Sequence, residues 1–266
     1  MSTDILTLLE SNKVLDYLNQ GKRFDKRKFD EARQIQITTD ISHAAEGSAR
    51  VKLGNTEVIC GIKMELGTPY PDSPDEGAMA TEVELLSLAS PNYEVGPPRD
   101  DSIELARVVD RSIRESHCID FNKLCIKEGE RAWVVFMDFY ALNYDGNLFD
   151  AFNIAGLAAL SNTKIPKIDD EAKRKIQGEY SGQLKMHNLP VLNSVAKISN
   201  HLVLDPGIAE EAAATAVFHV SLLENDDLNA IQKSGKGYFT YQELETALEM
   251  ASKNSKNVRK VINSLK

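Results

Sequence analysis

The clearest pattern in the chain is an alternation of apolar and polar residues in its first quarter, which is typical of half-buried β-strands. Ile35 and Ile37 mark the first such segment, 34–40. The segments 47–53 (GSARVKL) and 56–64 (TEVICGIKM) repeat the alternation on either side of Gly54-Asn55. A Gly-Asn pair between two alternating segments favours a tight turn, so we predict a β-hairpin here.

A helical period replaces this alternation elsewhere. Leucine and isoleucine recur at helical spacing in residues 1–20 and in a last helix that runs to about residue 265. Thr240 and Glu243 are spaced as a capping box at the start of that last helix. Residues 148–163 are small and apolar enough to form a helix that packs closely on a sheet. The largely apolar segment 132–143 predicts a strand buried on both faces.

The second half of the chain repeats the mixture of strands and helix. We predict strands over 192–198, 201–204, 214–223 and 228–233, although 212–215 suits a helix equally well. A polar, charged link separates this half from the first. The prediction is an α+β protein with two similar sheet-and-helix halves. Its parts are an N-terminal helix and charged link (1–33), a first domain (34–165), a polar link (166–183) and a second domain (184–266).

Residues 97–116 (PPRDDSIELARVVDRSIRES) are predicted to be a loop that leads into a helix. At about 100° per residue, Arg107, Arg111 and Arg114 fall on one stripe of this helix. A row of guanidinium groups can hold phosphates at fixed spacing, because each planar fork matches a pair of phosphate oxygens. The stripe is therefore a candidate anion-binding surface.

The same helix also fits an ordinary solvated surface. Its charged residues are spaced to form the ion pairs Glu104–Arg107, Arg107–Asp110 and Arg111–Glu115, each worth roughly 0.3 kcal/mol. Asp101 and Glu104 have the spacing of a capping box. The apolar side is expected to comprise Ile103, Ala106, Val109 and Ile113. Spacing alone favours surface ion pairs, so an anion-binding role needs other support.

Composition and charge limit the classes of function. The 266 residues are 42% hydrophobic and 27% charged, as in ordinary globular proteins, and no apolar run is long enough for a membrane span. The N-terminus is amphipathic and acidic, unlike a signal peptide, so we expect a cytoplasmic protein. The net charge of −9 argues against an indiscriminate nucleic-acid coat. Any RNA contact must be local or completed by a more basic partner.

Neither cysteine nor histidine indicates a metal site. Cys60, Cys118 and Cys125 lack CxxC spacing and are expected to be free thiols. The five histidines lack a metal-ligand spacing such as HExxH, and the chain has no glycine-rich phosphate loop such as GxxxxGK[ST]. We therefore expect no metal and no cofactor.

Several motifs, in order along nearly the whole chain, resemble the RNase PH family, most closely the non-catalytic RNase PH-like subunit of the archaeal exosome. The family's opening motif stands here as RFDKR (23–27) with Arg33 further on, and Lys26 replaces the usual glycine. The most specific match is ELARVVDRSIRES (104–116). GNTEV (54–58), LDPGIAEE (204–211) and AIQKSGKG (230–237) are also similar. The resemblance implies an RNase PH-like fold, which is the fold of ribosomal protein S5 domain 2.

The chain departs from active members of that family at two places. Their DGG(T/S)R segment, which cradles phosphate at a strand-to-helix turn, corresponds here to DGNLF (145–149). Leu148 and Phe149 cannot bind phosphate. Of the family's pair of acids, Glu211 can replace the first, but Val217 stands at the second position. We therefore expect no catalytic residue here, and expect Glu210 and Glu211 to be structural or at a subunit interface.

The resemblance implies a scaffold role in a 3′→5′ phosphorolytic exoribonuclease. Such a subunit forms a hexameric ring of three heterodimers with the catalytic RNase PH-like subunit, helps structure its active site and carries RNA-binding cap subunits. The resemblance assigns single-stranded RNA contact to Arg107 and Arg111, with Arg114 as a third candidate that could instead form a surface ion pair. Two alternatives stay open: an active RNase PH-like exoribonuclease, and a purely structural ring subunit without RNA contact.

Overall fold

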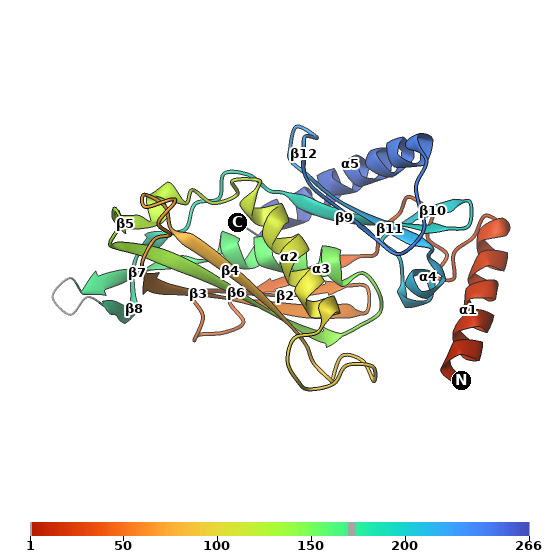
Figure 1. Cartoon of the computed structure of the whole chain (residues 1–266), viewed down its shortest axis with the longest axis horizontal. Helices are drawn as coiled ribbons and strands as arrows, with labels where there is room; N and C mark the ends of the chain where they lie inside the picture. The colour runs from red at the N-terminus through yellow and green to blue at the C-terminus, as the bar shows by residue number, and fades with distance from the viewer. Residues whose placement is uncertain (1, 170–173, 266) are drawn as a thin grey trace.

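The computed structural model describes residues 2–169 and 174–265 (Figure 1). Its larger sheet has the strand order β1-β2-β3-β6-β4, and β5 pairs with the end of β6. β4 and β6 run parallel, whereas the other pairs in this sheet are antiparallel. The strands are β1 (Ile35–Thr39), β2 (Gly47–Leu53), β3 (Thr56–Gly67), β4 (Ala78–Leu85), β5 (Cys125–Lys127) and β6 (Arg131–Asn143).

A second, antiparallel sheet of order β10-β9-β11-β12 follows in the other half of the chain. It consists of β9 (Val191–Ile198), β10 (His201–Leu204), β11 (Ala216–Leu222) and β12 (Leu228–Ser234). The helices are α1 (Ser2–Asn19), α2 (Asp100–Arg114), α3 (Leu148–Ser161), α4 (Ile208–Ala213), α5 (Tyr241–Asn263) and the short 3₁₀ helix η1 (Asn122–Leu124). The mixed α and β architecture with two sheet-and-helix halves confirms the predicted fold class.

Helix α3 is the centre of the core because it packs against β2 and β3 of one sheet and β9 of the other. It is buried from Asp150 to Leu160, as expected for a helix that is apolar on every side. Gly156 brings it close to β6, since a Cβ there would lie 3.0 Å from Met137 and Phe139. The hydrophobic pattern therefore places α3 between the two halves.

The predicted hairpin, the helices at both ends and the strands of the second sheet are confirmed with small shifts of boundary. The Thr240–Glu243 capping box is present, with the N–H of Glu243 donating to Thr240 Oγ1. The three cysteines are free, and Cys60 and Cys118 are buried. These elements depend on local signals, namely period, cap and turn.

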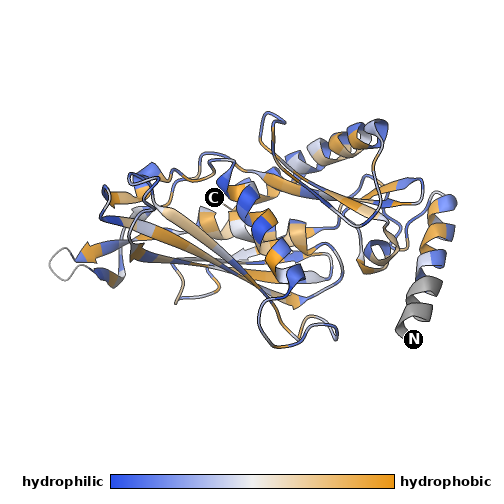
Figure 2. Cartoon of the chain, in the orientation of Figure 1, coloured by the Kyte–Doolittle hydropathy of each residue, from blue (hydrophilic) through white to orange (hydrophobic). Residues whose placement is uncertain are grey.

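Two elements differ from the predictions. Strand β6 is buried on one face only: Val135 and Met137 are inaccessible, but Phe136 is 37% exposed on the other face. Figure 2 shows both hydrophobic and hydrophilic residues along the strands of the larger sheet. The link expected over 166–183 is not irregular, because β7 (Lys164–Asp169) pairs with β8 (Arg174–Gln183) on either side of residues outside the described part.

Candidate nucleic-acid interface

Helix α2 lies against β4 at one side of the larger sheet (Figure 1). Leu105, Val108, Val109 and Ile113 form its buried face, whereas Ile103, predicted to be on the apolar side, is 44% exposed. The outer side of the helix carries the charged residues of the sequence motif. Burial of one face therefore leaves the arginine stripe on the accessible side.

The predicted capping box of α2 is wrong. The N-cap residue is Arg99, without a side-chain cap bond, so Asp101 lies within the first turn. The Glu104 carboxylate instead accepts hydrogen bonds from Gln232 Nε2 (3.1 Å) and Ser234 Oγ (2.8 Å) of β12. Glu104 thus ties α2 to the second sheet and is occupied away from the arginines.

The three candidate arginines line one cleft. A cavity of about 260 Å³ lies between α2 and β4, with Arg107, Arg111 and Arg114 on its wall beside Thr81 and Ala106. Arg107 is exposed and Arg111 is half-buried. Among the described residues, neither guanidinium has a hydrogen-bond or ion-pair partner, so the predicted pairs with Glu104, Asp110 and Glu115 are wrong. Two adjacent cations are left available to an external anion.

Arg114 differs from Arg107 and Arg111 because Asp110 binds its guanidinium through both carboxylate oxygens. Arg114 Nε donates to Asp110 Oδ2 (3.0 Å), and Nη2 donates to Asp110 Oδ1 (2.9 Å) and to the Met79 carbonyl (3.0 Å). Thr81 Oγ1 also donates to Asp110 Oδ1 (3.0 Å) and so orients the carboxylate. The hydrogen bonds and charge of Asp110 raise the pKa of Arg114. The free positive charge of the cleft therefore comes from Arg107 and Arg111.

The turn before α3, which the sequence resemblance matched to a phosphate-binding turn, is occupied by a carboxylate of this chain. Asn147 adopts a left-handed backbone with φ 56° and caps the helix. Its N–H donates to Glu211 Oε1 (2.8 Å), and Tyr144 Oη donates to Glu211 Oε2 (2.6 Å). Burial raises the pKa of Glu211, while the two hydrogen bonds act against that rise. The Asn147 N–H, which could otherwise bind an external anion, already donates to the Glu211 carboxylate.

The residues around this turn are closely packed. Leu148 is buried, and the Phe149 ring lies 4.1 Å from the His219 ring, centroid to centroid. A Cβ on Gly146 (φ 87°) would lie 2.6 Å from the backbone of Pro206–Ile208. Because only glycine tolerates both this φ and this approach, the turn is packed tightly against the LDPG segment.

The two positions expected from the family's acid pair are not together. Glu211 belongs to α4 and points to the Asn147 turn, whereas Val217 lies in β11. Val217 packs in an apolar cluster with Val14 and Leu18 of α1. Glu210 is buried in a two-bond ion pair with Arg23 (2.8 and 2.6 Å). Both glutamates are structural, as expected, and no acid pair is formed by Glu211 with residue 217.

A buried carboxylate that the sequence did not single out organises the opening motif. Asp205 binds Arg33 (2.7 and 2.9 Å) and Arg27 (3.1 Å) and accepts from Asn147 Nδ2 (2.7 Å). Arg33 also donates to the Asp145 and Gly146 carbonyls of the turn. Burial alone would raise the pKa of Asp205, but Arg33 and Arg27 hold it below its ordinary value. These bonds join the charged N-terminal link to both halves.

A second carboxylate, Asp150, lies next to this group. It accepts from Ser194 Oγ (2.6 Å), the Ser194 N–H (3.1 Å) and Asn147 Nδ2 (2.8 Å). Ser194 Oγ also lies 2.8 Å from His219 Nδ1. Burial, with the negative charge of Asp205, raises the pKa of Asp150 to about 7, and burial lowers that of His219 to about 3. This chain of polar groups is fully enclosed, so it stabilises the fold and does not face a substrate.

Over residues 2–169 and 174–265, no group of three or more His, Cys, Asp or Glu side chains is arranged to hold a metal ion. No helix in this part of the chain is long and apolar enough to cross a membrane.

The two sheet-and-helix halves have the architecture of an RNase PH-like fold. The chain matches domain 1 of the 3′ exoribonuclease family over residues 31–166 and domain 2 over residues 188–254. It therefore belongs to the 3′ exoribonuclease (RNase PH) family.

Within the family, the chain is similar to components of exosome complexes. The chain is 42% identical to the exosome complex component Rrp42 of Methanopyrus kandleri, with 98% of each chain covered. It is 39% identical to the Rrp42 of Methanocella arvoryzae, with 100% of each covered. A chain of the Archaeoglobus fulgidus exosome with RNA bound to the active site superposes with a TM-score of 0.90 at 41% identity, covering 96% of this chain and 98% of that one. A chain of an archaeal exosome core gives 0.88 at 38% identity, with coverage of 99% and 100%.

Proposed function

We propose that the chain is a non-catalytic subunit of a cytoplasmic, phosphate-dependent 3′→5′ exoribonuclease of the archaeal exosome type. It pairs with a catalytic RNase PH-like subunit, and three such heterodimers close a hexameric ring that carries RNA-binding cap subunits. In the ring it supports the active site of its partner and holds single-stranded RNA through Arg107 and Arg111. The full-length similarity to Rrp42 proteins supports this assignment.

The observation that carries the proposal is the Glu211 carboxylate on the Asn147 N–H. In active relatives the corresponding turn is expected to bind phosphate, the attacking group in phosphorolysis. A fixed negative charge at that N–H, next to Leu148 and Phe149, repels phosphate and fills its place. The chain therefore lacks the means to bind one of the two reactants.

The cleft beside α2 keeps a function that the turn has lost. Arg107 and Arg111 have no partner among the described residues, yet they lie side by side in one cavity. Unpaired guanidinium groups at adjacent positions suit the backbone of a single strand, which carries one phosphate per nucleotide. RNA bound there would contact this non-catalytic subunit and be cleaved in the active site of the catalytic partner.

The first experiment separates a scaffold from an enzyme. The chain purified alone is expected to leave a 5′-labelled single-stranded RNA intact in phosphate buffer, because it cannot bind phosphate at the turn. Co-purified with a catalytic RNase PH-like partner, it is expected to run as a larger assembly that releases nucleoside diphosphates. Gel analysis of the RNA and native mass measure both. Robust phosphate-dependent shortening by the lone chain would revive the active-enzyme alternative.

The second experiment concerns the arginines. Arg107→Ala with Arg111→Ala in the assembled complex is expected to weaken RNA binding and to flatten its dependence on salt. Two lost phosphate contacts reduce the slope of log K against log salt by about 1.4. Filter binding over a salt series measures the slope. Because neither side chain has an internal partner, the thermal stability of the variant should stay within about 0.5 kcal/mol of the parent.

A matched control removes two cations elsewhere. Arg50→Ala with Lys52→Ala takes the same charge from β2, where both side chains are about half exposed and pair with Glu57. This variant is expected to keep the parental slope. An unchanged slope for the Arg107/Arg111 variant in an intact assembly would favour a purely structural subunit.

A further inference from the structure

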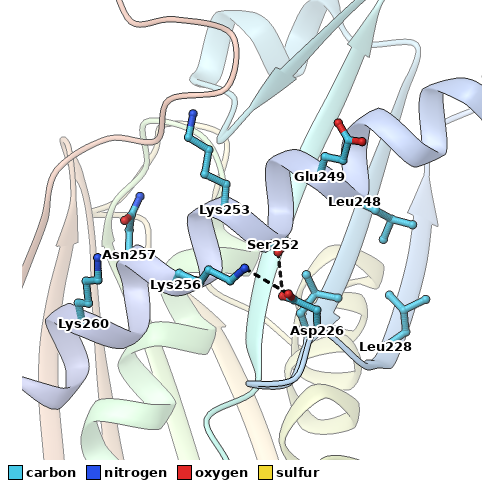
Figure 3. A pocket seen from close by; sticks show the side chains of 10 residues that line it. Asp226, Leu228, Leu248, Glu249, Ser252, Lys253, Lys256, Asn257 and Lys260 are labelled. Atoms are coloured by element: carbon cyan, nitrogen blue, oxygen red, sulfur yellow. Dashed lines mark hydrogen bonds and ion pairs between the residues drawn. The ribbon is translucent and has the colours of Figure 1, made fainter.

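A second cavity lies away from the arginine cleft, along α5. It has a volume of about 650 Å³ and is bounded by α5 on one side and the β11–β12 hairpin on the other (Figure 3). Helix α5 packs over β9, β10 and β11. The edge strand β12 is covered less by this helix, so its face beside α5 is more accessible. We call this cavity the α5 groove; it is lined by Leu222, Asp226, Leu228, Leu248, Glu249, Ser252, Lys253, Lys256, Asn257 and Lys260.

The floor of the α5 groove is apolar. Leu222 is buried at its base, Leu248 is half-buried, and Leu228 remains 49% exposed although it begins a strand. Figure 3 shows Leu228 and Leu248 close to one another at one end of the groove. Burying an exposed leucine side chain is worth about 1 to 2 kcal/mol. The floor therefore suits a partner that brings apolar side chains.

The groove is already formed in the folded chain. Arg259 is buried, and it donates from Nε to the Leu189 carbonyl (3.0 Å) and from Nη2 to the Leu222 carbonyl. On the opposite wall, Asp226 has a left-handed backbone (φ 65°) and accepts from Ser252 Oγ (2.8 Å). These contacts fix both walls, so little ordering is required when a partner binds.

The rim of the groove is basic. Lys253, Lys256 and Lys260 follow one another at helical spacing along α5 and are exposed. Lys256 pairs with Asp226 at 3.3 Å across the groove, and Lys253 pairs with Asp30 at 2.5 Å. These are exposed pairs of small worth, which a competing carboxylate can replace. The Lys260 ammonium has no partner among the described residues.

We propose that the α5 groove is a docking site for an acidic, leucine-rich amphipathic helix of another protein. The stretch of α5 from Leu248 to Lys260 is about 18 Å long, which matches three turns of helix. Apolar side chains at i, i+3, i+4 and i+7 would cover Leu228 and Leu248, while flanking carboxylates meet Lys256 and Lys260. The site is separate from the arginine cleft and does not depend on the role proposed for it.

The lining favours protein over RNA. Its floor is leucine, which neither stacks on a base nor hydrogen-bonds to a phosphate. Its cations are lysines, which lack the planar fork of the arginines on α2. A protein segment with both leucines and carboxylates satisfies the floor and the rim together.

The test uses a fluorescein-labelled peptide of about 14 residues that carries leucines at helical spacing and glutamates beside them. Its partner probe has lysine in place of each glutamate. By fluorescence polarisation, the acidic peptide is expected to bind the full chain with a Kd below about 100 μM, and the basic peptide at least about tenfold more weakly. Lys256→Glu with Lys260→Glu is expected to reverse this preference. Leu228→Ser is expected to weaken both peptides.

The control variant, Lys123→Glu with Lys127→Glu, reverses two exposed, ion-paired lysines away from the groove and is expected to bind as the parent does. Binding that is not saturable at 1 mM peptide, on the order of −4 kcal/mol, would overturn the proposal. The same conclusion follows if the lysine variants bind both peptides as the parent does. Displacement of the peptide by single-stranded RNA, or dimerisation that Leu228→Ser abolishes, would assign the groove to RNA or to a second copy.

Discussion

At the scale of single residues, three arginines on one helical stripe have different partners. Asp110 is three residues after Arg107 and four before Arg114, and both spacings allow an ion pair. The structure pairs it with Arg114 because Thr81 and the Met79 carbonyl of β4 hold both groups there. Sequence spacing could therefore identify the stripe but could not decide which guanidinium groups are free. That choice depends on a strand that is distant in the chain.

Asp110→Asn tests this difference directly. Without the carboxylate, Arg114 loses its two-bond ion pair and becomes a third cation in the cleft. Within the assembled complex, RNA affinity at low salt is expected to rise, and the slope of log K against log salt to steepen by about 0.7. Filter binding over the same salt series measures both quantities.

Asp101→Asn is the control, because it removes one negative charge from the first turn of the same helix. A general charge effect would raise RNA affinity equally in both variants. If Asp110→Asn leaves the slope at its parental value, then Arg114 does not reach RNA even when it is free, and the cleft offers two contacts only.

At the scale of elements, helices and strands with local sequence signals could be predicted, whereas those that depend on contacts with distant segments could not. The hairpin over 47–64 and the capped helix α5 have period, turn and cap in the sequence itself. Strand β8 has only Ile176 and Tyr180 as large apolar residues, and its place depends on pairing with β7 and on Lys175, which binds Glu46 and Glu65. Such contacts join distant segments, so a polar link was the natural prediction.

The short helix α4 shows the same limit. The strand predicted over 214–223 begins at Ala216, and the residues before it form α4 (Ile208–Ala213). Glu210 Oε2 accepts the N–H of Gly207 (2.9 Å) and fixes the first turn. This helix directs Glu211 towards Asn147. The sequence resemblance could identify Glu211 as a replacement for the first acid of the family's pair, but only the helix explains why Glu211 contacts the turn.

At the scale of the whole molecule, buried charge joins the N-terminal link and the two halves. Arg23 binds Glu210, and Arg33 binds Asp205 together with the turn before α3. Removal of one partner of a buried ion pair strongly destabilises the fold, because the other charge stays buried without a partner. The opening motif could be identified in the sequence. Its pairing with residues 204–211 could not, because most of the chain separates the two segments.

The same region makes the stability of the molecule depend on pH through Asp150. Its pKa of about 7 in the fold lies above the ordinary value of 3.8, because the carboxyl is buried and faces the charge of Asp205. The folded chain therefore holds a proton that the unfolded chain has released, and this contribution is lost as pH rises towards 7. His219, with its pKa lowered to about 3, acts in the opposite sense below pH 6.5.

Asp150→Asn separates the two effects, because an amide imitates the protonated acid and leaves His219 in place. The stability of the variant minus that of the parent is expected to grow from about pH 4 to about pH 7, by up to about 4 kcal/mol, and to level off above. Urea unfolding at intervals of pH measures this difference. Asp72→Asn, in an exposed loop, should give a constant difference near zero. A flat difference for Asp150→Asn would mean that Asp150 is already ionised in the fold at pH 4, with Asn147 and Ser194 stabilising its charge.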